Sequence, residues 1–149
     1  MPSHHKGTEE ERSALDLMIK LARASEAFFS RLHGPVAEAG LTVSQFGVLE
    51  TLLHLGPLRP SEIAEKHLKS RNNLTVVIDH LERDGLVERV RCPKDRRAQY
   101  IHLTEAGRSR IEAVFPNFVE GLVREASVLD AREQIELGNL LRKLGKGNA

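Results

Sequence analysis

Three cations lie close together in residues 88–104, a stretch with the pattern of a β-hairpin. Two strand-like segments, residues 87–90 and Gln99–Leu103, flank a turn that carries Lys94, Arg96 and Arg97. A hairpin needs no cations at its turn for stability, so they indicate an arm that reaches phosphate or an A·T-rich minor groove. The alternative is a solvated turn that is merely charged. Asp95 cannot attract phosphate, and we expect it to orient a neighbouring arginine.

The residues directly before the hairpin predict an amphipathic helix over residues 71–84. Ser70 can cap its start, and Gly85 supplies a left-handed stop. One face is apolar and anchors the helix through Leu74, Val77, Ile78 and Leu81. The opposite side carries residues whose side chains can contact base edges or phosphate: asparagine pairs with adenine, and valine or the threonine methyl packs on thymine. The set that we predict to contact DNA is Ser70, Arg71, Asn72, Asn73, Thr75, Val76, His80, Arg83, Lys94, Asp95, Arg96 and Arg97.

A shorter helix is predicted upstream, over residues 60–68, with Pro60 at its first position, where a missing N–H costs nothing. A short turn then links it to the helix over residues 71–84, which is the helix-turn-helix plan. Further upstream, Thr42 and Gln45 form a capping box that opens another helix, and Gly56-Pro57 closes it.

These blocks together resemble the MarR (multiple antibiotic resistance regulator) family of winged-helix transcription factors. The resemblance rests on the order and spacing of Ser70-x-x-Asn73-Leu74-Thr75, residues 78–87, residues 95–98 and residues 103–108, and it is strongest over residues 41–110. It implies a mainly α fold with a small β-hairpin, a winged helix-turn-helix flanked by terminal dimerisation helices. It also implies a ligand-responsive repressor that acts as a homodimer on a palindromic operator. Val76 departs from many relatives, which carry a basic or polar residue there, so the operator sequence stays open.

The flanks of the chain predict long helices with broad apolar surfaces. Residues 9–32 and 105–145 are the expected dimerisation helices, and residues 42–104 are the expected winged-helix lobe of a single domain. Pro116 is expected to kink the first helix of the second flank. Because these helices have little to bury against in a monomer, a two-fold dimer is predicted, with a monomer of folded-back helices as the alternative. The expected order is α-α-α-α-β-β-α-α, with room for a short helical piece after Pro35.

The net charge of the chain does not indicate DNA binding, but the distribution of its charged residues does. The net charge is +1, but residues 59–110 hold 12 Lys and Arg against 8 Asp and Glu, a net of +4. No apolar run reaches the roughly 18 residues of a membrane span, and residues 1–7 lack the apolar core of a signal peptide. With a single cysteine, which cannot form an internal disulfide, the chain is expected in the reducing cytoplasm and not at a membrane.

Enzyme chemistry finds no support in the motifs. The chain has no G-x-S-x-G, no phosphate-cradling glycine loop and no H-E-x-x-H. Its seven histidines include no i,i+4 pair, so a metal sensor would need ligands from distant segments. No cofactor is predicted.

The effector is expected from the resemblance alone, because relatives hold phenolic or aromatic acids between the dimerisation helices and the winged helix. The residue types that match such a site here are Phe28, Phe29, Arg31, His33, His54 and Phe115, all of which are equally suited to ordinary packing or surface positions. Three alternatives remain. Cys92, with cations nearby that favour a thiolate, could serve a thiol or electrophile sensor, although oxidation-sensing relatives usually place that cysteine in the N-terminal helix. The chain could also be a ligand-independent architectural DNA-binding protein, or a winged helix used for protein contacts alone.

Overall fold

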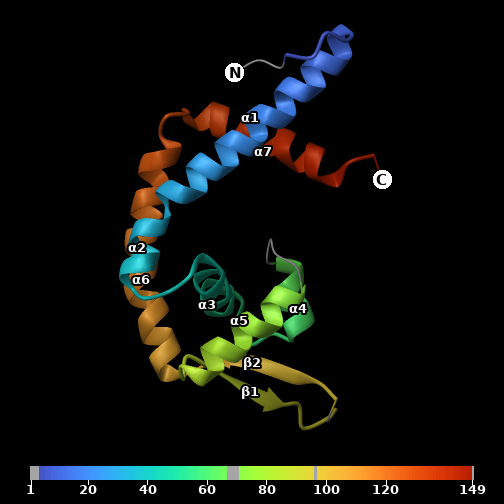
Figure 1. The fold of residues 1–149 in the computed structure, drawn as a ribbon. Coiled ribbons are helices and arrows are strands. Elements are labelled where there is room, and N and C mark those ends of the chain that lie inside the picture. Colours follow the sequence, from blue (N-terminus) through green and yellow to red (C-terminus); the bar gives the residue numbers. More distant parts are fainter. Residues whose placement is uncertain (1–3, 67–70, 96, 149) are drawn as a thin grey trace. The chain divides into compact units, whose positions relative to one another are not determined.

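The computed structural model describes residues 4–66, 71–95 and 97–148, without the side chains of residues 71 and 72. The elements in chain order are α1 (Glu9–Arg31), α2 (His33–Glu38), α3 (Val43–Leu55), α4 (Pro60–Lys66), α5 (Arg71–Arg83), β1 (Val87–Arg91), β2 (Gln99–Leu103), α6 (Glu105–Ala126) and α7 (Ala131–Lys146) (Figure 1). They form two compact units: His33–Val119 is one, and Met1–Leu32 with Glu120–Ala149 is the other. The mainly helical architecture with one hairpin confirms the predicted fold class.

Helix α3 runs through the centre of the unit His33–Val119. Its capping box is the predicted one, since the Gln45 N–H donates to Thr42 Oγ1 over 3.1 Å and the Thr42 N–H donates to Gln45 Oε1 over 2.9 Å. Gly56 ends the helix with a φ of 77°, which a residue with a side chain rarely adopts. Between these ends Phe46, Val48, Leu49, Thr51 and Leu52 are all buried, so α3 contributes side chains to the core in several directions.

The other elements of this unit pack their apolar faces around α3. The fully buried side chains that they supply include Ile63 of α4, Ile78 and Leu81 of α5, Ile101 of β2 and Ile111 of α6. Removing such side chains from water is the main favourable term in the stability of the unit, at about 25 cal/mol per Å² of apolar surface. The core therefore fixes the position of α5 and of the hairpin at the surface.

The hairpin pairs β1 and β2 in an antiparallel register, with Val87 opposite Leu103 and Arg89 opposite Ile101. A further bridge joins Leu58 to Ile101: the Leu58 N–H donates to the Ile101 carbonyl over 3.3 Å, and the Ile101 N–H donates to the Leu58 carbonyl over 2.8 Å. The base of the hairpin is thereby tied to the segment that leads into α4.

The start of α6 packs against the loop between α5 and β1 at unusually short range. A Cβ atom added to Gly107 would lie 1.9 Å from the backbone oxygen of Leu86, so only glycine fits. The Thr104 hydroxyl donates to the Gly85 carbonyl over 2.6 Å and accepts the Gly107 N–H over 3.0 Å. Thr104 and Gly107, which lie in the block of residues 103–108 that carries the family resemblance, therefore fasten α6 to the end of α5.

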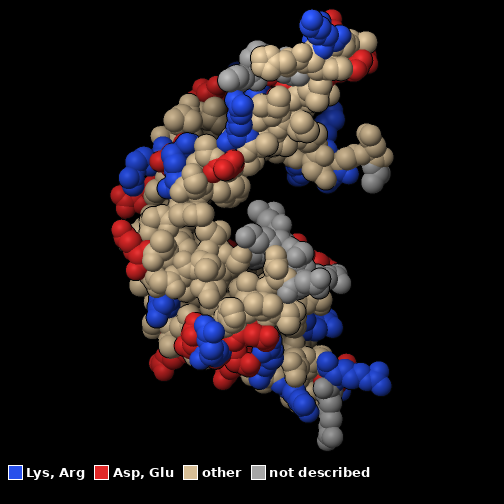
Figure 2. All heavy atoms as spheres, viewed as in Figure 1, with Lys and Arg blue, Asp and Glu red and all other residues tan. Residues whose placement is uncertain are grey.

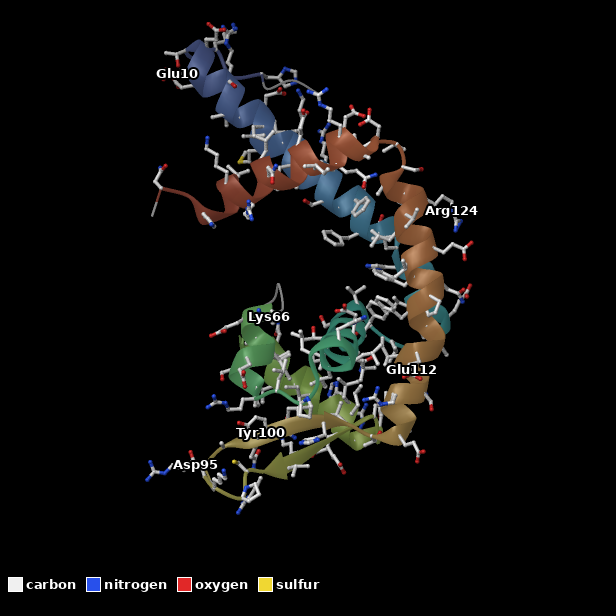
Figure 3. All side chains as sticks on the ribbon, turned by 180° about the vertical axis from the view of Figure 1, so that it is seen from behind. Glu10, Lys66, Asp95, Tyr100, Glu112 and Arg124 are labelled. Atoms are coloured by element: carbon white, nitrogen blue, oxygen red, sulfur yellow. The ribbon has the colours of Figure 1, made fainter. Side chains whose placement is uncertain are left out.

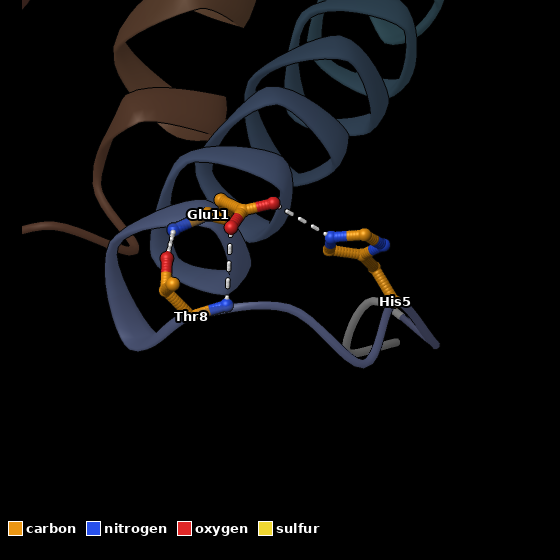
Figure 4. A network of polar contacts seen from close by, with 3 residues as sticks. All are labelled: His5, Thr8 and Glu11. Carbon is orange, nitrogen blue, oxygen red and sulfur yellow. Dashed lines mark hydrogen bonds and ion pairs between the residues drawn. The ribbon is translucent and has the colours of Figure 1, made fainter.

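The second unit consists of α1, the end of α6 and α7. A capping box of Thr8 and Glu11 opens α1 (Figure 4), and one of Asp130 and Glu133 opens α7. Within this unit Arg31 Nε lies 2.5 Å from Glu125 Oε2. No described residue of α1 or α7 is buried. Large apolar side chains lie exposed on these helices: Leu17, Met18, Leu21, Phe29, Ile135, Leu137, Leu140, Leu141 and Leu144.

Several boundaries differ from those predicted. The short helix α2 starts at His33 and contains Pro35, whereas a piece after that proline was expected. Proline suits this first turn because it lacks only an N–H that would have no helical partner. Helix α6 contains Pro116, as the predicted helix does, and the kink expected there stays a prediction. The last two residues of the helix predicted over residues 60–68 lie outside the described residues.

Candidate nucleic-acid interface

Helix α5 presents one buried and one exposed side, as its sequence predicts. Leu74, Ile78 and Leu81 are 4%, 1% and 0% exposed, and Val77 is half-buried. The predicted contact residues with described side chains all lie on the exposed side: Asn73, Thr75, Val76, His80 and Arg83. Val76 is 52% exposed, which is unusual for a valine on a packed helix and leaves its methyl groups available to an apolar base edge.

A glycine stop ends α5 and aims the chain into the hairpin. Gly85 has a φ of 75°. Its N–H donates to the Glu82 carbonyl over 3.0 Å, and the Leu86 N–H donates to the Leu81 carbonyl over 2.9 Å. This pair of bonds is the Schellman motif, which confirms the left-handed stop predicted at Gly85. At the other end, the predicted cap Ser70 lies outside the described residues, and Arg71 and Asn72 are placed only as the first residues of α5.

The turn of the hairpin is held by backbone bonds and leaves its cations in solvent. The Cys92 N–H donates to the Ala98 carbonyl over 2.9 Å, and the Ala98 N–H donates to the Asp95 carbonyl over 3.0 Å. Lys94, Asp95 and Arg97 are exposed. Figure 2 shows blue cationic side chains at the lower right, with red acidic ones on the surface beside them, and Figure 3 shows Asp95 at the turn. Arg96 lies outside the described residues.

Asp95 holds the turn through the backbone. Its Oδ1 accepts the N–H of Arg97 over 3.0 Å. The carboxylate therefore holds the main chain at Arg97, two positions further on, and orientation of an arginine side chain by Asp95 stays a prediction.

Arg89 joins the hairpin to α5, a role that was not predicted from the sequence. Its Nη2 lies 2.5 Å from Asp79 Oδ1 and its Nη1 lies 2.6 Å from Glu82 Oε1. Burial of the guanidinium opposes its charge, but hydrogen bonds and attraction from both carboxylates outweigh this and raise the pKa of Arg89. The available signal was two carboxylates three positions apart on a helix with an arginine on the next strand. That pattern alone does not predict an ion pair between the strand and the helix.

The six predicted ligand residues fall into the two units. In the unit that contains α1 and α7, the Phe28 and Phe29 ring centroids lie 5.9 Å apart, and Arg31 pairs with Glu125. In the unit His33–Val119, the His54 and Phe115 ring centroids lie 4.8 Å apart, and His54 Nδ1 lies 2.9 Å from the Glu50 carbonyl oxygen. His33 is exposed at the start of α2. The structure thus brings together two aromatic pairs, each within its own unit.

Other chemistry receives no support among the residues that the structure describes. Cys92 is half-buried at the end of β1 and unpaired with another cysteine. In the same residues no three His, Cys, Asp or Glu side chains gather in a way that could hold a metal ion. Over those described ranges, no helix is both long enough and apolar enough to span a membrane.

Comparisons with known proteins agree on one class, the winged helix-turn-helix regulators. A model of the MarR family matches residues 41–98. The chain is 35% identical over 137 residues to the uncharacterized HTH-type transcriptional regulator YkoM of Bacillus subtilis (strain 168), covering 92% of this chain and 89% of that protein. It is 30% identical over 139 residues to the transcriptional repressor MdtR of the same organism, covering 91% and 90%. The solved structure of NadR in complex with 4-hydroxyphenylacetate is similar, with a TM-score of 0.73, 26% identity and coverage of 99% and 100%.

The chain therefore belongs to the MarR family of DNA-binding transcription regulators. This confirms the resemblance drawn from the sequence, and membership of a regulator family agrees with the expectation that the chain is not an enzyme.

Proposed function

We propose that this chain is a dimeric repressor that reads a near-palindromic operator with α5, holds the DNA backbone with its hairpin, and releases DNA when a small aromatic or phenolic effector binds. The observation that carries the proposal is the exposed side of α5, with Asn73, Thr75 and Val76, next to a hairpin turn that bears Lys94 and Arg97. Arg89 links the two elements. Base edges and phosphates can then be contacted by one rigid surface.

The DNA contacts divide into two kinds that a titration can separate. Arg97→Gln removes a phosphate contact, so it should weaken binding to every duplex. The salt slope, which is the steepness with which the logarithm of the binding constant falls with the logarithm of the salt concentration, should decrease by about 0.9. Asn73→Ala removes a base contact, so it should cost about 1–3 kcal/mol on the operator and little on random DNA. Anisotropy titrations of both variants at several salt concentrations test this. Equal losses on both duplexes for Asn73→Ala would assign α5 to positioning only, and an unchanged Arg97→Gln would remove the hairpin from the interface.

The dimer is supported by the apolar side chains exposed on α1 and α7. Leu140 is 63% exposed and Ile135 is 67% exposed, although helices of a stable monomer bury such residues. Leu140→Asp distinguishes a monomer from a dimer. At an exposed site of a monomer the substitution changes the free energy of unfolding by no more than about 0.5 kcal/mol, whereas at a dimer interface it disrupts association. Sedimentation should show a dimer for the wild type and for the control Asn139→Asp, and monomer for Leu140→Asp. A dimeric Leu140→Asp protein would contradict this interface.

The effector proposal rests on the relative NadR, whose structure contains 4-hydroxyphenylacetate, and on the aromatic pairs of the two units. A tenfold loss of operator affinity requires only about 1.4 kcal/mol of preference for the DNA-free form. A panel of aromatic acids, phenols and quinones should contain a compound that lowers operator binding, and Phe29→Ala or His54→Ala should change that response more than DNA affinity. An inactive panel would favour constitutive binding, and loss of binding on oxidation that needs Cys92 would favour a thiol sensor.

A further inference from the structure

A surface groove lies between the start of α4 and the hairpin. Its volume is about 340 Å³; Arg59 and Ser61 form one wall, and Asp95, Arg97 and Gln99 form the other. A second, smaller groove of about 190 Å³ is lined by Pro60 and Ser61 and also by Leu74 and Thr75 of α5. Pro60 and Ser61 line both grooves, so the start of α4 lies between the exposed side of α5 and the turn of the hairpin.

The backbone fixes Arg59 at this position. The bridge between Leu58 and Ile101 pairs the segment before α4 with β2 through two hydrogen bonds, of 3.3 and 2.8 Å. Arg59 directly follows this bridge, so its backbone is held beside the hairpin that carries Arg97. Arg59 and Arg97 therefore line the same, larger groove.

The Arg59 side chain keeps part of its hydrogen-bonding capacity available. Its Nε lies 3.2 Å from Glu62 Oε1, which also accepts the Arg59 backbone N–H over 3.1 Å. Among the described residues, neither terminal Nη group of Arg59 has a partner, and the side chain is 53% exposed. A guanidinium with two free nitrogens can bind a phosphate in a bidentate manner.

The carboxylates near the groove are engaged by the main chain. Glu62 accepts the Arg59 N–H, and Asp95 accepts the Arg97 N–H over 3.0 Å. These bonds direct the two acidic groups toward the backbone of the residues whose cationic side chains border the groove. The nearby turn adds the exposed cation Lys94.

We propose that the groove receives the sugar–phosphate backbone of the operator and that Arg59 contacts one of its phosphates. This rests on the proposed function: a DNA strand that touches both Thr75 of α5 and Arg97 of the hairpin must pass over the start of α4, where Arg59 is the cation. Arg59 is thus a DNA-contact residue that lies outside both α5 and the turn of the hairpin, the two elements whose DNA contacts were predicted from the sequence.

Arg59→Gln tests the proposal, with Arg108→Gln as a matched control. Arg108 is 54% exposed and pairs with Glu112 on α6, so both variants remove one charge and one exposed ion pair with a glutamate. Arg59→Gln should lower the salt slope of DNA binding by about 0.9, which is about an eightfold loss of affinity at 0.1 M salt on operator and random duplexes alike. Arg108→Gln should leave the slope unchanged, and Arg59→Lys should restore most of it.

The outcomes separate this inference from the proposed function. Similar unfolding temperatures for the two glutamine variants, with a reduced slope only for Arg59→Gln, support the phosphate contact. An Arg59→Gln protein that binds like the wild type, while Arg97→Gln loses affinity, overturns the groove contact and leaves the proposed function in place. A wild-type protein that binds no duplex overturns both.

Discussion

Replacing Arg89 with methionine should weaken both the fold and DNA binding, because Arg89 is the polar link between α5 and the hairpin. The variant loses two hydrogen-bonded ion pairs, of 2.5 and 2.6 Å. It keeps most of the apolar contact made by the arginine stem, since methionine is similar in length to that stem. The change therefore isolates the charged link from the packing beneath it.

The size of the effect follows from exposure. An exposed ion pair contributes about 0.2–1 kcal/mol, and pairs that are largely buried contribute more when broken. Arg89 is 23% exposed, but Asp79 and Glu82 are 55% and 43% exposed and regain water when the arginine is removed. Solvation of the two carboxylates limits the loss, so we expect the free energy of unfolding to fall by about 1–2 kcal/mol, or the Tm by about 2–8 °C.

DNA binding should fall by a related amount. If the operator contacts both α5 and the hairpin, binding must restore the spacing that Arg89 fixes in the free protein, at a cost of about 1–2 kcal/mol or 5- to 30-fold in Kd. Thermal unfolding by circular dichroism and anisotropy titration at a temperature well below the Tm measure the two effects. Arg108→Met controls for loss of an exposed arginine. An Arg89→Met protein that matches this control in both measurements would refute the positioning role.

Three further outcomes follow from the described contacts. Gly107→Ala should destabilise the fold by about 1–3 kcal/mol or more in a denaturant titration, because the added Cβ would lie 1.9 Å from the Leu86 oxygen. The control Gly121→Ala, which has open space around the added Cβ, should not be destabilised in this way. Equal stabilities of the two variants would contradict the close approach of α6 to Leu86. Cys92→Ser should retain operator binding under reducing conditions, because the contact that Cys92 makes in the turn is through its backbone N–H; a large loss would assign its side chain a direct role. The hydrogen bond from His5, followed by the bonds from Thr8, lowers the pKa of Glu11 below 4.5, so its contribution to α1 should be complete above that pH and lost as the pH falls through the folded-state pKa (Figure 4). Far-ultraviolet circular dichroism should show that this acid-dependent fraying of α1 is absent in Glu11→Gln, and an identical acid profile for both proteins would contradict the capping contribution.

Local patterns in the sequence predicted the parts of the interface that depend on neighbours in the chain. The Thr42–Gln45 capping box, the Gly85 stop and the apolar face of α5 each involve residues within a few positions of one another. Hydrogen-bonding geometry and helical periodicity therefore sufficed to place them. The same holds for the hairpin, whose strands are separated by a short turn.

Contacts between separate elements were not predictable in the same way. The Leu58–Ile101 bridge joins residues far apart in sequence, and no periodicity marks Leu58 as strand-like. Arg89 is similar, since its partners on α5 are defined only once the hairpin register turns it toward that helix. The role proposed for Arg59 depends on a long-range bridge and on a groove, and the residues around Arg59 in the sequence indicate neither.

Selection of bound duplexes from a random-sequence library by the purified full-length protein, read by sequencing, tests the central claim most directly. A two-fold dimer that presents two copies of α5 should enrich a near-palindrome whose half-sites are centred about one helical turn apart, roughly 10–10.5 base pairs. The Asn73→Ala protein should lose preference at symmetric positions in both half-sites. Enrichment of a single asymmetric site, or of no sequence at all, would contradict a dimeric operator-binding repressor that reads DNA through α5.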